Sequence, residues 1–220
     1  EIARAAKLTD EGLRWLLGRL KPGVTEKEVA LELEVWYRRQ GADHVAFPPI
    51  VAFGEGTSMP HYQPGDRELK EGDLVLMDVG ARVGGYCADL TRVVAFGRPH
   101  PRKRQIYQLV LEANRAGLEA VRAGISGVEA DRAARQVIEQ ANFGEKFGHG
   151  LGHGVGLEVH EAPRLSPTSE DTLEAGMVVT VEPGVYLPGQ FGVRIEDLVV
   201  VHPDGCEILS SFPKEELLVL

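Results

Sequence analysis

Two stretches of the sequence repeat one pattern at an interval of 104 positions: GDLVLMDVG at 72–80 and GMVVTVEPG at 176–184. Each opens on a glycine, continues as an apolar run typical of a buried strand, and reaches a carboxylate at its seventh position. These carboxylates are Asp78 and Glu182, and the strands expected to return after each turn carry Asp89 and Glu196. The repeat therefore predicts two corresponding hairpins, each with a pair of acidic side chains.

Helix signals precede each hairpin in the same order. The motifs Thr25-x-x-Glu28 and Ser126-x-x-Glu129 are capping boxes, in which hydroxyl and carboxylate each satisfy a free amide at a helix start. The four expected helices run over 2–19, from 25 to near 41, over 104–122, and from 126 to near 142. The order helix, helix, hairpin thus occurs twice, which predicts one α+β domain over residues 1–220. Its halves, roughly 1–100 and 101–220, would surround a mixed sheet covered by helices.

Composition excludes several classes of protein. The 220 residues include 24 Lys and Arg against 33 Asp and Glu, for a formal net charge of −9, which argues against binding to nucleic acid or anionic membranes. The most apolar stretch, 45–53, is short and interrupted by two prolines, and the first residues resemble no signal peptide. Only Cys87 and Cys206 are present, so no disulfide framework is expected and a cytoplasmic location is predicted.

The four acidic residues of the hairpins are candidate metal ligands. A carboxylate buried at the end of an apolar strand is costly unless it is paired or bound to a metal. For any one of them alone, a role as a turn residue or a salt-bridged structural acid is as good an explanation as metal binding. Two corresponding pairs brought to a common axis would instead suit two divalent cations ~3.5–4 Å apart.

A glycine-rich segment supplies histidines. Residues 148–161 read GHGLGHGVGLEVHE, and so many glycines favour a loop or an irregular strand over a helix. The segment contains His149, His153 and His160, of which His149 alone is readily explained as a residue that shapes the loop. Known motifs do not account for this glycine-rich segment. It lacks G-x-G-x-x-G spacing, and the stretch that begins at His160 does not match H-E-x-x-H because Arg164 stands where the second histidine would be.

The sequence resembles the pita-bread metallopeptidases, the family of methionine aminopeptidases, Xaa-Pro aminopeptidases, Xaa-Pro dipeptidases (prolidases) and creatinase. The resemblance covers essentially the whole chain and rests on MDVG at 77–80, DLTR at 89–92, GHGVG at 152–156, VEPGVY at 181–186 and GVRIED at 192–197. It implies the pita-bread (creatinase/aminopeptidase) fold, with two pseudo-symmetric halves around a curved sheet. It also implies five metal ligands, which are Asp78, Asp89, His153, Glu182 and Glu196.

The resemblance also implies a chemistry. Asp89 and Glu196 would bridge two divalent ions, Asp78 would complete one ion, and His153 with Glu182 the other. The oxygen-rich ligand set favours Mn(II), with Co(II), Fe(II) or Zn(II) as alternatives. A metal-bound hydroxide would attack the scissile carbonyl, with Glu182 relaying its proton.

Within the family the sequence is closer to the proline-specific branch. The residues that carry this preference are DLTR, the stretch VYLPG at 185–189, and His61, which lies 17 positions before Asp78. His61 and His160 would donate hydrogen bonds to the carbonyl and the tetrahedral intermediate. The substrate-binding residues expected from the resemblance are His61, His160, Arg194, Tyr186 and His149. A merely structural role stays open for His61, His149 and Arg194.

The predicted function is hydrolysis of the bond between an N-terminal residue and proline. The substrate would be a peptide with proline at its second position, and the protein is expected to be a homodimer. Alternatives are a methionine aminopeptidase and a non-catalytic peptide-binding module of the same fold. Arg164 and Arg194 are candidates for the cation that a dipeptidase needs for the proline carboxylate. Proline-branch enzymes usually carry an N-terminal domain, so the 220 residues are expected to correspond to the catalytic domain alone.

Overall fold

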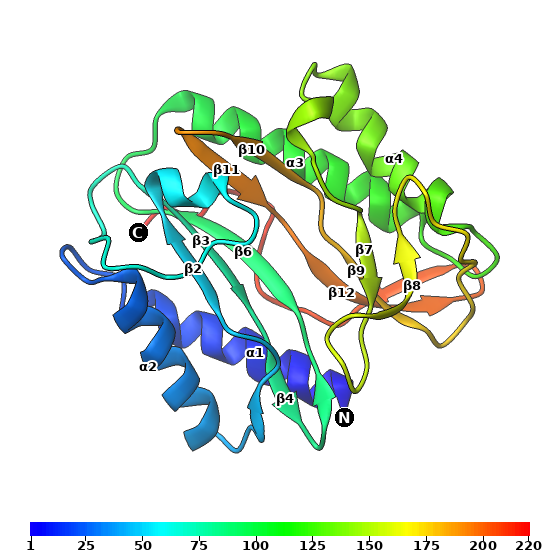
Figure 1. Ribbon diagram of the computed structural model, residues 1–220, viewed down its shortest axis with the longest axis horizontal. Helices are drawn as coiled ribbons and strands as arrows, with labels where there is room; N and C mark the ends of the chain where they lie inside the picture. The colour runs from blue at the N-terminus through cyan, green and yellow to red at the C-terminus, as the bar shows by residue number, and fades with distance from the viewer.

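Four α-helices occur in two pairs, as the sequence predicts. The computed structural model describes residues 1–220, and Figure 1 shows one pair on either side of the strands. The helices are α1 (Ile2–Leu17), α2 (Glu26–Arg39), α3 (Pro101–Ala120) and α4 (Gly127–Gln140). Both capping boxes form, since Thr25 and Ser126 each accept from the backbone amide three residues on while the glutamate there reaches back. The second helix of each pair therefore begins where local sequence alone placed it.

Both predicted hairpins are present. In the first half, β3 (Leu74–Val79) pairs antiparallel with β6 (Leu90–Ala95) and with β2 (Ile50–Phe53). In the second half, β9 (Val178–Val181) pairs antiparallel with β12 (Asp197–His202). The remaining strands of this five-stranded sheet are β13 (Gly205–Ile208), β7 (Gly152–Gly154) and β8 (Glu161–Leu165). The glycine-rich segment thus contains an irregular strand, with a register shift between His153 and Gly154.

Along the chain, strands of a smaller sheet occur between the two strands of each predicted hairpin. The first is formed by β1 (His44–Val45), β4 (Ala81–Val83) and β5 (Tyr86–Cys87), and the second by β10 (Gly184–Leu187) and β11 (Phe191–Arg194). In place of the one mixed sheet that we expected, the strands form four sheets, and every pair of named strands is antiparallel. The α+β class and the repeated order of elements are confirmed.

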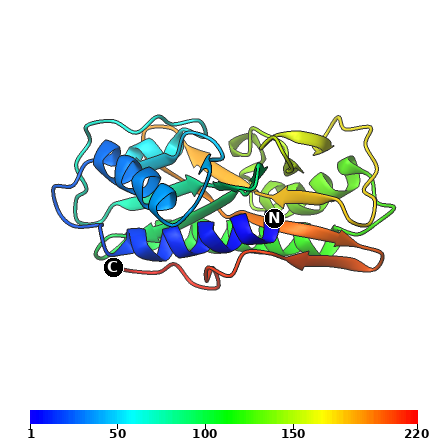
Figure 2. The same cartoon turned by 90° about the horizontal axis from the view of Figure 1, so that it is seen from below.

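Apolar packing fixes the helices against the strands. One cluster of 28 buried residues joins α3 and α4 to strands of both halves, and a second of 18 joins α1 and α2 to the first hairpin. Leu13 of α1 and Val110 of α3 are fully buried, as expected for the apolar faces of amphipathic helices. Figure 2 shows α1 and the C-terminal segment along one side of the strands. No helix has the length and apolar composition needed to cross a membrane.

The two halves meet where the carboxylates lie. The amide of Glu196, just before β12, donates to the carbonyl of Thr91 in β6 at 3.2 Å. This backbone hydrogen bond links the returning strand of one half to that of the other. Because Asp78 lies next to the last residue of β3 and Glu182 directly follows β9, the fold brings all four acidic residues to this junction.

Candidate metal centre

A cavity of about 670 Å³ opens at the junction of the two halves. Each half contributes side chains to its lining, from the ends of β3 and β9, the starts of β6 and β12, and the irregular strand β7. All five predicted ligands line it: Asp78, Asp89, His153, Glu182 and Glu196. Residues up to 118 positions apart in the sequence are thereby brought to one site.

His153 points its Nε2 atom at the acidic side chains. Its Nδ1 lies 3.0 Å from the carbonyl of Gly154, an acceptor, so Nδ1 carries a proton. Nε2 lies 3.2 Å from Oε1 of Glu182 and 3.7 Å from Oδ2 of Asp89. This is the arrangement of a metal-binding imidazole, whose second nitrogen is commonly fixed by a backbone carbonyl.

The acidic side chains strongly perturb one another. Burial raises the pKa of Asp89 well above 3.8, and the charges of Glu196 and Asp78 raise it further. Burial likewise raises the pKa of Glu196 well above 4.5, with Glu182 and Asp78 contributing. Burial acts in the same direction on Glu182, but the hydrogen bond and charge of His153 outweigh it and hold its pKa below 4.5. The same contact raises the pKa of His153 although burial opposes this.

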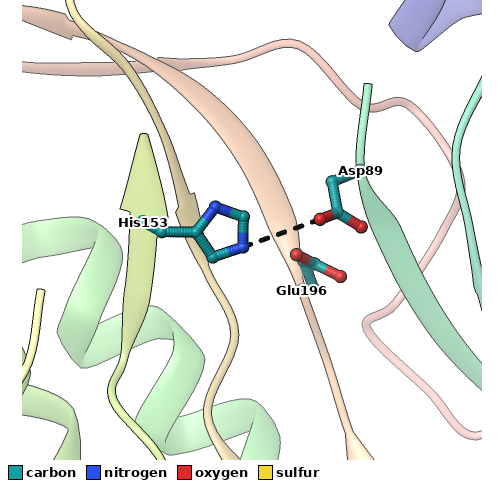
Figure 3. Close-up of side chains that lie close together, drawn as sticks. All are labelled: Asp89, His153 and Glu196. Atoms are coloured by element: carbon teal, nitrogen blue, oxygen red, sulfur yellow. Dashed lines mark ion pairs between the residues drawn. The ribbon is translucent and has the colours of Figure 1, made fainter. Parts of the chain in front are cut away.

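These residues fit divalent cations. One oxygen each of Asp78 and Asp89 is buried without a hydrogen-bond partner, which is costly for a carboxylate. Ligand atoms of Asp89, His153 and Glu196 lie within 4.8 Å of one another, and Figure 3 shows these side chains converging. A cation among them would supply the missing partner and remove the mutual repulsion of the carboxylates. Oxygen ligands with one imidazole suit a hard or borderline divalent metal.

Arg194 is held by the protein itself. Its Nη2 donates to Oδ2 of Asp78 at 2.6 Å, its Nε to Thr91 at 3.0 Å, and its Nη1 to the hydroxyl of Tyr186 at 2.8 Å. Tyr186 also lies 2.8 Å from Nε2 of His149, whose Nδ1 lies 2.8 Å from the carbonyl of Gly150. The tyrosine hydroxyl accepts from Arg194 and donates to a neutral His149, whose pKa is lowered by burial.

This chain of hydrogen bonds changes what we expect of three residues. Tyr186 is buried and does not line the cavity. We therefore expect it to support Arg194 and not, as the resemblance implied, to contact the substrate. Arg194 lines the cavity, but its guanidinium is turned toward Asp78. His149 lines the cavity with both ring nitrogens engaged, so substrate contact through its nitrogens would require it to break a hydrogen bond.

The remaining predicted residues lie at the mouth of the cavity. His61 and His160 are both exposed and line the cavity. The His160 ring lies edge-on to that of His153, with centroids 4.3 Å apart, and burial together with the His153 charge lowers its pKa. Arg164 faces His153 across the β7–β8 pair, lines the cavity, and forms no ion pair. The sequence alone did not place Arg164 in the site.

Sequence reasoning assigned no role to two threonines that contact predicted ligands. The hydroxyl of Thr91 donates to Oε2 of Glu196 at 2.6 Å, and that of Thr180 donates to Oε1 of Glu182 at 3.0 Å. The sequence did contain a pattern that could have identified these threonines, because side chains two positions apart on a strand lie on the same face of the sheet. Thr91 follows Asp89 by two positions and Thr180 precedes Glu182 by two.

Comparison with known proteins identifies the family of this site. The profile of metallopeptidase family M24 matches residues 1–203, which is most of the chain. The chain belongs to metallopeptidase family M24. Its fold is accordingly the pita-bread fold that the resemblance implied, and the M24 assignment agrees with the cluster of candidate ligands at the junction.

Relatives of this M24 chain include solved structures. The chain is 45% identical to an Xaa-Pro dipeptidase from Bacillus anthracis over 100% of its own length and 61% of the other, with a TM-score of 0.97. An X-Pro aminopeptidase from Thermotoga maritima is 42% identical over 100% and 62% of the two chains, again with a TM-score of 0.97. The uncharacterized peptidase YqhT of Bacillus subtilis is 45% identical over 99% of this chain and 62% of its own. The chain thus spans about three fifths of these relatives.

Proposed function

We propose that this protein is a metal-dependent exopeptidase that hydrolyses the bond between an N-terminal residue and proline. The observation that carries the proposal is the convergence of five ligand-type side chains on one cavity whose remaining lining suits such a substrate. Phe47, Ile50 and Pro60 supply apolar surface, and Arg164 supplies an unpaired cation. The names of the two structural relatives, an Xaa-Pro dipeptidase and an X-Pro aminopeptidase, support the same substrate class.

The five side chains would hold two divalent metal ions. Asp89 and Glu196, from corresponding positions of the two halves, would be shared by both ions. Asp78 would complete the coordination of one, and His153 with Glu182 that of the other. The ligand set favours Mn(II) without excluding Co(II), Fe(II) or Zn(II). Bound metal would supply Lewis acidity and lower the pKa of a bound water.

Glu182 is suited to moving a proton during hydrolysis. Its Oε1 is occupied by Thr180 and His153, whereas Oε2 has no hydrogen bond within the protein. Its lowered pKa keeps the carboxylate ionised at neutral pH. We assign to Oε2 the proton that the attacking water gives up as its oxygen bonds to the carbonyl carbon. The same proton would pass to the proline nitrogen as the C–N bond breaks.

The histidines at the cavity mouth would stabilise the charge that develops on the carbonyl oxygen. Because its pKa is lowered, His160 is neutral at pH 7 and retains one N–H to donate. His61 lines the same mouth and would donate a second hydrogen bond. Donors fixed in place before the reaction stabilise a developing oxyanion more effectively than water does.

Proline imposes a particular demand on the site. Its nitrogen in the scissile bond has no hydrogen, so recognition cannot use an amide N–H. Phe47, Ile50 and Pro60 instead offer apolar contact to the ring. In a dipeptide the proline carboxylate is free, and the unpaired guanidinium of Arg164 would bind it.

The proposal is tested by assaying the full-length protein with Mn(II) on Ala-Pro, Ala-Pro-Ala and Met-Ala. We expect cleavage of both proline peptides, complete loss with a chelator, and loss in Glu182→Ala. Glu174→Ala changes an exposed glutamate outside the cavity and is the matched control. Arg164→Ala should raise KM for Ala-Pro much more than for Ala-Pro-Ala.

Two other outcomes would replace this function. Preferential release of methionine from Met-Ala would indicate a methionine aminopeptidase. Peptide binding that is unaffected by a chelator, with no hydrolysis under any metal, would indicate a binding module. Location in the cytoplasm and assembly as a homodimer stay predictions.

A further inference from the structure

Glu26 is a fully buried carboxylate outside the candidate metal centre. It is the first residue of α2 and is 0% exposed. Its Oε1 accepts from the amide of Phe53, and its Oε2 accepts from the hydroxyl of Tyr62 and the amide of Gly65, each at 2.8 Å. No cation pairs with it. Because a buried carboxylate is costly without such partners, these three donors determine where the side chain can lie.

The three donors enclose the segment that carries His61. Phe53 lies just before the short 3-10 helix Gly54–Ser58, and Gly65 lies beyond His61. Between Pro60 and Pro64 no backbone group bonds to another backbone group. The His61 ring also makes no hydrogen bond to the protein and is exposed. Its place at the cavity mouth therefore depends on its neighbours in the sequence.

Tyr62 is the neighbour that is fixed. Burial and the Glu26 carboxylate raise the pKa of Tyr62 to about 12, so its hydroxyl remains a donor at neutral pH. Its ring packs on Gly56, where an added Cβ would lie 3.0 Å from Cζ of the tyrosine. On the other side, the hydroxyl of Thr57 accepts from the amide of Gly192 in β11 at 2.8 Å. Residues 53–65 are thus held between β11 and Glu26.

Pro60 and His61 line the cavity, whereas Tyr62 and Glu26 do not. We infer that Glu26 and Tyr62 are positioning residues, which act through the backbone of the 59–65 segment to hold His61 over the substrate. The inference rests on the proposed function. A displacement of the order of 1 Å can cost about 100-fold in rate. Loss of one of three tethers should cost less, and we expect Tyr62→Phe to lower kcat/KM on Ala-Pro about tenfold.

A double-mutant cycle separates positioning of His61 from a general structural role. The variants are Tyr62→Phe, His61→Ala and the combination, each assayed on Ala-Pro with Mn(II). If Tyr62 acts through His61, the tenfold loss disappears once His61 is alanine. An equal loss in both backgrounds, or no loss at all in Tyr62→Phe, would overturn the inference. Tyr86→Phe, at an exposed tyrosine outside the cavity, is the control and should be neutral.

Metal binding provides a further check on the cycle. The affinity for Mn(II), measured by calorimetry, should be the same in wild type and Tyr62→Phe because Tyr62 contacts none of the candidate ligands. A tenfold weaker affinity would show that the substitution disturbs the whole site and would overturn the inference.

Amide hydrogen exchange tests the tether without reference to activity. Tyr62→Phe should speed exchange of the Gly65 amide, which shares Oε2 of Glu26 with the tyrosine hydroxyl. Unchanged exchange would overturn the tether whatever the protein hydrolyses. If the wild type cleaves no proline peptide, the proposed function fails, and faster exchange in the variant still supports the tether. The two failures are therefore distinguishable.

Discussion

At the scale of single residues, the candidate metal centre depends on side chains that are not themselves candidate ligands. Thr91 accepts from Nε of Arg194 at 3.0 Å and donates to Glu196 at 2.6 Å. The Thr91 hydroxyl thus links the buried guanidinium of Arg194 to the carboxylate of Glu196, which we propose is shared by two metal ions. Such outer contacts fix the orientation and basicity of metal ligands.

Thr91→Val replaces this hydroxyl by a methyl group of similar volume. Glu196 then loses its hydrogen bond, and we expect the affinity for Mn(II) to fall about 10–100-fold. Calorimetric titration of the metal into apo protein measures the change. Thr168→Val, at an exposed position outside the cavity, should titrate like wild type. An unchanged affinity in Thr91→Val would show that the fold holds Glu196 in place without this hydroxyl.

His160→Ala removes a donor without disturbing the interior, because the side chain is exposed. We expect kcat on Ala-Pro to fall about 10²–10³-fold with little change in metal affinity. Steady-state kinetics on metal-loaded protein tests this. His202→Ala changes another exposed histidine, which does not line the cavity, and should retain full activity. Equal activity of the two variants would remove His160 from the mechanism.

At the scale of elements, the two capping boxes show how much local sequence determines. Hydrogen bonds from the hydroxyl and backbone of Ser126 lower the pKa of Glu129, and the backbone and hydroxyl of Thr25 do the same for Glu28. A carboxylate whose pKa is lower in the folded state stabilises that state at pH above its unfolded pKa. This contribution is lost as the pH falls through the folded pKa.

Glu129→Gln should therefore change the pH dependence of folding. The capping geometry is preserved, since glutamine also occurs at this position of the motif. The free energy of unfolding should be lower than that of wild type at pH 7. The difference should shrink as the pH falls below 4.5, the ordinary pKa of the glutamate. Urea unfolding across this range measures it, with exposed Glu139→Gln as control. A difference independent of pH would contradict the assignment.

The elements that the sequence did not reveal have a common physical cause. Periodicity and caps identified the four helices and the strands that end in Asp78 and Glu182, because those signals are local. The short strands β4, β5, β10 and β11 have only two to four residues each, too few to show a period. The contacts of Glu26 with Tyr62 and of Arg194 with Asp78 join residues 36 and 116 positions apart, and no local pattern encodes them.

At the scale of the whole molecule, buried ionic groups join the C-terminal segment to the strands behind the metal centre. Asp197, next to Glu196, pairs with Arg92 at 2.8 Å and also with Lys214. Burial acts to raise the pKa of Asp197, but these two cations outweigh it and hold the pKa below 3.8. Lys214 further donates to Oδ1 of Asn114 in α3 at 2.7 Å. One lysine thus connects the C-terminal segment, a helix and a strand.

Lys214→Met should destabilise the folded protein by about 1–3 kcal/mol, because Asp197 and Asn114 each lose a buried partner. The effect stays below the complete loss of a buried pair, since Arg92 still neutralises Asp197. Urea denaturation at pH 7 measures the difference. Lys70→Met, at an exposed lysine without an ion pair, should be neutral. A neutral Lys214→Met would mean that Arg92 alone is sufficient.

The scattered origin of the candidate ligands determines when the centre can form during synthesis. Glu196 is made 118 residues after Asp78, which at the usual rate of translation is a delay of about 6–24 s. The first hairpin can fold on the ribosome in that interval, but its two aspartates have the complete set of partners from the second half only once Glu196 follows His153 and Glu182. Premature capture of a metal by the nascent chain would therefore be weak, and full loading must wait until Glu196 has been made.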